Sequence, residues 1–325
     1  MTTTQILARF PQLSALVVGD ICLDRWCVYD PAAAEPSRET GIPRVGVVST
    51  ETTPGAGGTV ANNLASLRVG RIAVLGAIGE DGTGWELRQA LAARRIDDSR
   101  LVLVKGAQTF TYTKLINKST GQEDLPRLDF INVRPLPADA EAAILQRLRS
   151  SVAGFDVIIV ADQAETDMGG VVTPAVREAL SELARRNPQK IFWVDSRMRC
   201  ELFRDVIVKP NQREAEEACL RLLGRVDFAA LRTTIGPRPL IVTHGAQGAQ
   251  IWDELAPVWV HTKPAHGAVD ICGAGDSFTA GAAMAMAVTR SAVEAARIGN
   301  LVAYVTIHKP GTGTASPEEV LTAAQ

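Results

Sequence analysis

A carboxylate follows three small residues in the stretch DICGAGDSF, residues 270–278. Gly273, Ala274 and Gly275 let the backbone turn tightly and approach a ligand closely. The Ala-rich segment after Asp276 predicts a helix, so the loop leads into a helix N-terminus, whose amide groups attract anions. Beside a bound phosphate, Asp276 would be unfavourable unless it accepts a proton from an attacking hydroxyl. The stretch therefore predicts a phosphoryl-transfer site in which the amides hold the phosphate and Asp276 is the base.

Polar side chains at the ends of predicted strands could complete such a site. They are Asp20, Asp24, Asp162, Asp195, Asn211 and Thr243. One aspartate after a strand is commonly a turn former or a helix cap. Several of these residues at the carboxyl edge of one parallel sheet, together with the GAGD loop, predict a pocket.

Strand and helix patterns alternate along most of the chain. Apolar runs predict strands at 15–20, 72–75, 156–162, 190–196, 205–211 and 239–245, and helical spacing predicts helices at 85–94, 138–152, 173–187 and 212–224. The alternation predicts an α/β fold of three layers, α/β/α, with a mainly parallel central sheet between helices.

Two stretches, 26–54 and 106–132, interrupt this alternation with residues typical of strands. The second has a polar turn at 117–122 between two alternating runs, which predicts a hairpin. We expect one domain over residues 1–325, with both stretches forming a small projecting sheet. A lid over the site is the functional interpretation, and a surface flap without a role is the alternative.

Composition argues against several classes of function. The formal net charge of −2 offers no basic excess for nucleic acid or an anionic membrane. The five cysteines and four histidines follow no zinc or disulfide pattern, and no apolar run approaches the ~20 residues that span a bilayer. The N-terminal residues lack the apolar core of a signal peptide. We therefore expect a cytoplasmic protein with reduced thiols.

Six motifs, in order along nearly the whole chain, carry a resemblance to one family. They are PGAGGTVANNLASL (54–67), GAIGEDGTG (76–84), KPNQREAEEA (209–218), VTHGAQGAQIW (242–252), VDICGAGDSFTAG (269–281) and HKPGTGTASPEEV (308–320). They resemble the motifs of the PfkB, or ribokinase-like, carbohydrate kinases. Within that family, VVGDICLDRW and RLDF are most similar to the heptose-phosphate kinase branch. The sequence has no G-x-x-x-x-G-K-[ST], so it does not resemble a P-loop enzyme.

The resemblance implies roles for the matching residues on the catalytic and nucleotide sides. Asp276 matches the catalytic base, and the amides of Gly273, Ala274 and Gly275 match an anion hole. The matches on the nucleotide side are Asn211, Glu214, Thr243, Gly245, Gly248 and Asn300. The first two would organise the nucleotide phosphates and Mg²⁺, with Glu214 acting through water. The next three would form the nucleotide loop, and the last would lie near the adenine.

On the acceptor side, the matching residues are Asp20, Asp24, Gly57, Gly58, Thr59 and Asn63. The two aspartates would hold sugar hydroxyls, and the glycine backbone would face the acceptor. Thr59 stands where the family has Asn, so the neighbouring Asn62 or Asn63 is the candidate to replace that contact. These differences leave the identity of the acceptor open.

The resemblance also implies a monovalent-cation site. Asp270 matches the start of the family's cation loop, with Gly311 on its far side. Cys272 replaces the usual Thr of that loop. K⁺ is therefore a candidate activator, in addition to the expected cofactors ATP and Mg²⁺.

We therefore expect an ATP-dependent kinase that phosphorylates a hydroxyl of a small sugar or sugar phosphate. A nucleoside kinase on the same scaffold is one alternative. A non-catalytic sugar-binding regulatory protein is another, and the intact GAGD argues against it. Because a projecting sheet leaves one face and its edges uncovered, we also expect a homodimer joined through the lid strands.

Overall fold

The computed structural model describes residues 1–166, 170–253, 256–267 and 269–325. A large sheet runs through the molecule, and over these residues it has eight strands in the order β14-β13-β12-β11-β10-β9-β1-β4. Their bounds are Ser14–Gly19 (β1), Arg71–Leu75 (β4), Val157–Asp162 (β9), Ile191–Ser196 (β10), Ile207–Val208 (β11), Leu240–Thr243 (β12), Ala249–Trp252 (β13) and Val258–Val260 (β14). Pairing is parallel from β4 to β12 and antiparallel from β12 to β14.

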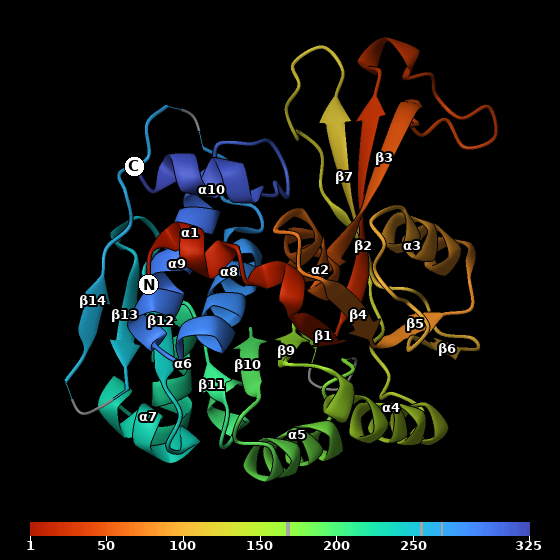
Figure 1. Ribbon diagram of the computed structural model, residues 1–325. Helices are drawn as coiled ribbons and strands as arrows, with labels where there is room; N and C mark the ends of the chain where they lie inside the picture. Colours follow the sequence, from red (N-terminus) through yellow and green to blue (C-terminus); the bar gives the residue numbers. More distant parts are fainter. Residues whose placement is uncertain (167–169, 254–255, 268) are drawn as a thin grey trace.

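Helices cover both faces of this sheet (Figure 1). One face carries Thr3–Leu7 (α1), Gly57–Ser66 (α2), Gly82–Ala93 (α3), Ala274–Thr289 (α8), Ala292–Thr306 (α9) and Pro317–Ala323 (α10). The other face carries Ala138–Ser151 (α4), Pro174–Arg186 (α5), Gln212–Leu223 (α6) and Phe228–Ile235 (α7). The predicted three-layer α/β/α fold is thus confirmed. Within the described ranges, no helix has the length and apolar character needed to cross a bilayer.

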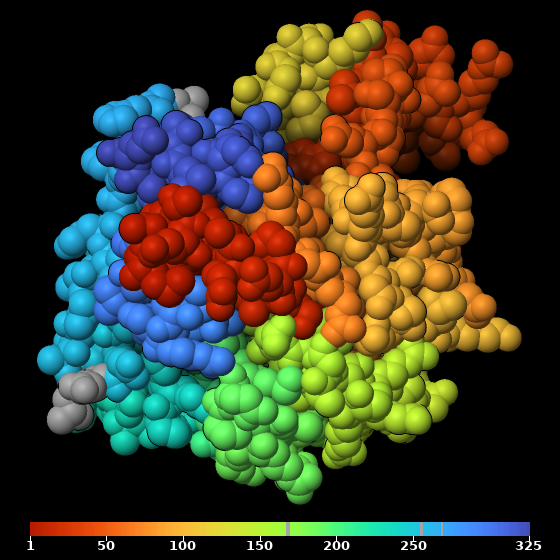
Figure 2. Space-filling view, in the orientation of Figure 1, coloured from red at the N-terminus to blue at the C-terminus, as the bar shows by residue number. Residues whose placement is uncertain are grey.

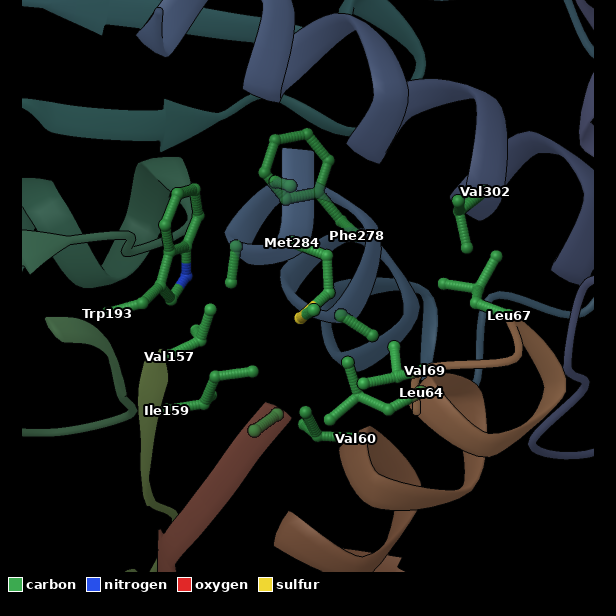
Figure 3. Close-up of a cluster of buried hydrophobic side chains, with 14 of the residues drawn as sticks. Val60, Leu64, Leu67, Val69, Val157, Ile159, Trp193, Phe278, Met284 and Val302 are labelled. Carbon is green, nitrogen blue, oxygen red and sulfur yellow. The ribbon is translucent and has the colours of Figure 1, made fainter. Parts of the chain in front are cut away.

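Alternating side chains divide the core into two layers. In β1, Val17 packs toward α2 and α8, whereas Leu16 and Val18 pack toward α4 and α5. In the first layer, Phe278 and Met284 of α8 lie among side chains of α2, α9 and the central strands (Figure 3). This packing fixes α8 against the sheet, and with it the position of the GAGD loop at the N-terminus of the helix.

One strand is shorter than the sequence pattern predicts. Residues 205–211 were expected to be extended, but the ladder of β11 includes only Ile207–Val208. Pro210 has no amide hydrogen to continue that ladder. Its carbonyl instead accepts the amide of Thr243 at 3.0 Å, which holds the ends of β11 and β12 together.

A second, smaller sheet projects from the body, and we call it the lid sheet (Figures 1 and 2). Its order is β3-β2-β7-β8, with bounds Ile21–Tyr29 (β2), Val47–Ala56 (β3), Thr111–Asn117 (β7) and Leu128–Phe130 (β8). β7 and β8 pair antiparallel, as the predicted hairpin requires, and β2 pairs parallel with β7. Two further strands, Ala77–Gly79 (β5) and Val102–Val104 (β6), form a separate short pair.

The lid sheet begins almost where the large sheet ends. β2 starts at Ile21, directly after Asp20, rather than near residue 26. Gly19 makes this junction possible, since its φ is +130° and a Cβ there would lie 2.2 Å from the carbonyl oxygen of Ala161. The first lid strand therefore rises from the carboxyl edge of the large sheet, where a ligand site is expected.

Candidate active site

The GAGD loop forms the N-terminus of α8. Gly273 is the N-cap residue with φ +74°, and, among the described residues, no side chain caps this end. A Cβ on Gly273 would lie 3.3 Å from methyl groups of Thr312 and of Thr59. The tight turn therefore packs between the Thr312 loop and the first turn of α2. The amide of Ala274 donates to the carbonyl of Ile271 at 3.1 Å in this state, and the helix N-terminus as a whole favours an anion.

Asp276 lies in the first turn of α8 and lines a pocket between the body and the lid sheet. Desolvation, and then the nearby carboxylate of Asp195, raise the pKa of Asp276 to about 7. The cations Lys209 and Arg197 oppose this rise. A carboxylate with a pKa near neutrality can accept a proton from a hydroxyl more readily than an ordinary aspartate.

Lys209 is a functional candidate that the sequence analysis missed. Its Nζ lies 2.6 Å from the carboxylate of Asp195, and both side chains are buried. Burial disfavours the charge, yet Asp195, Glu214 and Asp276 raise the pKa of Lys209 in sum. A Cβ on Gly275 would lie 3.4 Å from this Nζ, so the cation lies directly beside the GAGD amides. The available signal was a lysine two residues before Asn211, at the end of a predicted strand.

Four side chains of the lid sheet face the pocket in two register pairs. Asp24 pairs with Tyr112 and Trp26 pairs with Lys114 across β2 and β7. Because side chains at i and i+2 share one face of a strand, this arrangement follows from the sheet geometry. The lid sheet therefore supplies one wall of the pocket that contains Asp276.

Asp24 lies where the sequence analysis expects an acceptor ligand. Burial raises the pKa of Asp24 to about 6, although Lys114 and Arg127 act to lower it. Gly55 on the neighbouring strand makes room for the carboxylate, since a Cβ there would lie 2.3 Å from Oδ1 of Asp24. Asp24 thus faces the same pocket as Asp276 and is placed to hold a hydroxyl.

Three cations also line this pocket, and the sequence analysis did not identify them. They are Lys114 of β7, Arg127 just before β8 and Arg197 just after β10. Each has an acidic partner: Lys114 Nζ lies 3.7 Å from Glu123, Arg127 donates to Asp129 at 2.6 Å, and Arg197 pairs with Glu165. They come from separate segments that meet only in the folded chain, so no local motif marks them as a group.

Thr59 lines the pocket together with Asp24, whereas the remaining predicted acceptor residues, Asp20, Gly57, Gly58 and Asn63, are not part of its lining. Asp20 is buried, and its carboxylate accepts the backbone amides of Gln163, Ala164 and Val171 at 2.8–2.9 Å. These bonds hold the segment after β9, which brings the side chain of Gln163 to the pocket. Asp20 is therefore placed to position the pocket rather than to touch an acceptor.

The glycines and asparagines of α2 have packing contacts. A Cβ on Gly57 would lie 2.8 Å from Ile21, and one on Gly58 would lie 2.6 Å from Pro54. Asn63 is fully buried and donates to the carbonyl of Thr59 at 3.0 Å. The neighbouring Asn62 accepts a hydrogen bond from Arg94 at 2.5 Å. Of the α2 residues that the resemblance assigns to the acceptor, Thr59 is therefore the one that lines the pocket.

The nucleotide-side residues lie together at the ends of β11 and β12. Asn211 and Glu214 form a reciprocal capping box at the start of α6, with hydrogen bonds of 2.9 and 2.7 Å. An isolated parallel bridge joins Asn211 to Thr243. Burial, and then Asp195, raise the pKa of Glu214, while Lys209 lowers it. Glu214 is thus electrostatically connected to the cation beside the GAGD amides.

The predicted nucleotide loop follows Thr243. Gly245 has φ +55° and Gly248 has φ +98°, where a Cβ would lie 2.2 Å from the carbonyl of Val260. Asn300 of α9 donates to that residue's carbonyl at 2.8 Å. The loop and the predicted adenine-side residue are therefore joined through β14.

Asp270 joins the two loops beside the N-terminus of α8. One carboxylate oxygen accepts the amide of Cys272 at 2.9 Å, and the other accepts the amide of Gly311 at 2.8 Å. Asp270 and Gly311, which the resemblance places on two sides of a monovalent-cation site, are thus in direct contact, and the cation site itself stays a prediction. A cation bound near Asp270 would further stabilise the two loops, which the Asp270 carboxylate already holds together.

A profile of the pfkB family carbohydrate kinases matches residues 14–319. The chain belongs to this family. It is 28% identical over 324 residues to the bifunctional protein HldE of Trichlorobacter lovleyi and 30% identical over 330 residues to that of Methylococcus capsulatus. The alignments cover 98% and 97% of this chain, and the chain spans 64% of the length of each relative.

Solved structures of sugar and nucleoside kinases share the fold of this pfkB-family chain. The ribokinase of Thermotoga maritima has a TM-score of 0.69 at 19% identity, covering 96% of this chain and 99% of that chain. Phosphofructokinase-2 of Escherichia coli, in complex with potassium, has a TM-score of 0.70 at 18% identity, covering 96% and 98%. Membership confirms the predicted family and the phosphotransferase class, and the roles of individual residues stay predictions.

Proposed function

We propose that this pfkB-family kinase transfers the γ-phosphoryl group of ATP to a hydroxyl of a small sugar phosphate. The observation that carries the proposal is the composition of one pocket. It contains Asp276 and Asp24, which suit a base and a hydroxyl ligand, together with the cations Lys114, Arg127 and Arg197. A neutral sugar needs hydrogen-bonding groups, but it does not need three cations.

In this proposal, Asp276 accepts the proton of the attacking hydroxyl. The amides of Gly273, Ala274 and Gly275 and the ammonium of Lys209 stabilise the charge on the phosphoryl group in flight. The buried Lys209 fits an anionic ligand at this helix N-terminus, because its ammonium lies beside Gly275 and, in the part of the chain that the structure describes, has one acidic group, Asp195, within salt-bridge distance. Positioning and preformed charge, rather than covalent chemistry, would supply most of the rate enhancement.

Residues on the nucleotide side fit ATP and Mg²⁺. Glu214 is a carboxylate of the kind that holds Mg²⁺ through water, and Asn211 fixes its position through the capping box. Bound Mg²⁺ would neutralise phosphate charge. Thr243 and the loop from Gly245 to Gly248 would contact the nucleotide, with Asn300 near its base.

The three pocket cations would hold the phosphate that the acceptor already carries. Arginine suits this role because its planar guanidinium binds phosphate oxygens in a bidentate way. Arg127 is exposed, but its guanidinium lies over the ring of Tyr112, at 4.9 Å from the ring centroid, which limits its movement. The heptose-phosphate kinase branch, which VVGDICLDRW and RLDF resemble, is consistent with such an acceptor.

The test is ADP release with matched acceptor pairs: ribose and ribose 5-phosphate, fructose and fructose 6-phosphate, and a heptose with its phosphate. Inosine represents the nucleoside alternative. We expect kcat/KM to be at least ~10-fold higher for the phosphorylated member, since a hydrogen bond to a charged group is worth about 1.5–3 kcal/mol. Arg127→Gln should remove that preference, and Arg134→Gln, an exposed arginine outside the pocket, should keep it. Equal turnover within each pair, or a preference for inosine, would contradict the proposal.

A further inference from the structure

We propose that Trp26 is a positioning residue that couples the lid sheet to the loops around the anion hole. The inference rests on the proposed function, because it assigns the GAGD amides to the transferred phosphoryl group. It adds a specific mechanical link that neither the motifs nor the family resemblance indicated. The link runs from β2 to Gly311, from Gly311 to Asp270, and from Asp270 to the start of α8.

The first contact joins the lid sheet to the Gly311 loop. A Cβ on Gly311 would lie 3.3 and 3.4 Å from Cζ2 and Cη2 of Trp26, so the six-membered ring of the indole packs against the glycine. Gly311 has φ +69°, a conformation that suits glycine and leaves its surface bare for this contact. Trp26 therefore fixes how closely the Gly311 loop can approach the lid sheet.

The second contact passes from that loop to the GAGD segment. The amide of Gly311 donates to one oxygen of Asp270, and the amide of Cys272 donates to the other. Cys272 immediately precedes Gly273, the N-cap of α8. A shift of the Gly311 loop would therefore be transmitted through one carboxylate to the residues that orient the anion-hole amides.

A parallel contact strengthens the same link. Lys114, the register partner of Trp26, lies over the indole at 4.5 Å from the ring centroid, and its Nζ lies 3.8 Å from Sγ of Cys272. Lys114 thus touches both Trp26 and the GAGD segment. Because Asp24 is two residues from Trp26 on the same face of β2, a ligand held by Asp24 would stabilise the same position of the strand.

Linkage makes the coupling reciprocal, so it can be measured without an acceptor. If Trp26 holds the Gly311 loop, then Trp26→Ala should speed hydrogen exchange at the amides of Gly311 and Cys272 by at least ~5-fold, since local opening sets that rate. Exchange in the central strands β1 and β9 should stay unchanged. Trp85→Ala, which removes an exposed tryptophan from α3, is the matched control and should leave both amides unaffected.

Two further variants keep the test decisive. Trp26→Phe retains a ring for Lys114 but lacks the second ring that contacts Gly311, so it should also speed exchange, by a smaller factor. Gly311→Ala introduces a methyl group against the indole, and its effect on exchange at Cys272 should be smaller in Trp26→Ala than in the wild type. That non-additivity would report the contact itself, because the backbone strain at Gly311 is common to both backgrounds.

Binding of a nucleotide tests the coupling in the opposite direction, from the anion hole to the lid sheet. MgADP should slow exchange in residues 21–29 of the wild type, and Trp26→Ala should abolish this slowing. Unchanged exchange at Gly311 and Cys272 in folded Trp26→Ala and Trp26→Phe would overturn the inference. So would the absence of slowing in the wild type, or equal slowing in Trp26→Ala. None of these measurements needs turnover, so a protein that passes them but phosphorylates no acceptor would refute the proposed function and leave the coupling standing.

Discussion

In the proposed reaction, the carboxylate of Asp276 is the group that accepts the proton of the attacking hydroxyl. Its pKa of about 7 results from desolvation and from Asp195, and it would be higher without Lys209. The same lysine that favours ionisation of the base also lies beside the amides of the anion hole. One buried cation would therefore serve both the proton acceptor and the phosphate.

The pH dependence of kcat/KM follows from this pKa. Asp276 must be ionised to accept a proton, so activity should fall as pH decreases through about 7. Asp24, with a pKa of about 6, should steepen the loss at lower pH, because its protonation weakens its role as a hydroxyl acceptor. Initial rates at saturating ATP and limiting acceptor test this. A profile that is flat across this range would count against ionised Asp276 as the base.

Acceptor contacts make a second prediction at the residue scale. Asp24→Ala should lower kcat/KM for every acceptor by at least ~10-fold, because it removes a charged, half-buried hydrogen-bond partner from the pocket. Thr59→Asn should change the ranking among acceptors while leaving ATP affinity unaffected, since Thr59 belongs to the described lining of this pocket and the predicted nucleotide residues do not. The measurement is kcat/KM over the acceptor panel for each variant. An unchanged ranking in Thr59→Asn would show that this side chain does not select the acceptor.

At the scale of elements, the sequence predicted the loop and helix that contain Asp276, but it did not predict the cations that line the same pocket. Glycines, alanines and one aspartate mark a loop entering a helix in any context, so GAGD could be read from local rules. Lys114 lies on β7, Arg127 just before β8 and Arg197 just after β10, and only tertiary structure brings these cations together. The same reasoning explains Asp20: an aspartate after a strand can face a ligand or hold a loop, and here its three amide contacts are tertiary.

The Asp270 bridge predicts a response to monovalent cations. Asp270 orders both Cys272 and Gly311, so a cation coordinated near this carboxylate would stiffen the segment that precedes the anion hole. We expect a higher kcat in K⁺ than in Na⁺ at equal ionic strength, with little change in the KM for the acceptor. The comparison requires protein exchanged thoroughly into each salt. Equal rates in the two salts would contradict an activating cation site at Asp270.

At the scale of the whole molecule, the lid sheet leaves apolar side chains in solvent. They include Val47 and Val48 of β3 and Leu128 and Phe130 of β8, each between 44% and 53% exposed. β3 and β8 are the edge strands of that sheet, and exposed edges favour pairing with another chain. We therefore predict a homodimer through the lid strands.

Sedimentation at micromolar concentration tests this prediction. The expected mass is twice the 34.7 kDa of one chain, and Val48→Glu should shift the protein toward the monomer. Val293→Glu, which alters an exposed valine on α9, is the matched control and should leave the dimer intact. A monomeric wild type would refute pairing through the lid sheet.

The most direct test of the whole account is acceptor-dependent ADP release by the wild type and by Asp276→Asn. The substitution keeps the shape of the side chain but removes the proton acceptor. The wild type should release ADP when a sugar phosphate is added. The folded variant should lose this activity by at least ~100-fold, the lower range for a general base, while still binding MgADP. Near-normal turnover in Asp276→Asn, or no acceptor-dependent release by the wild type, would contradict the account.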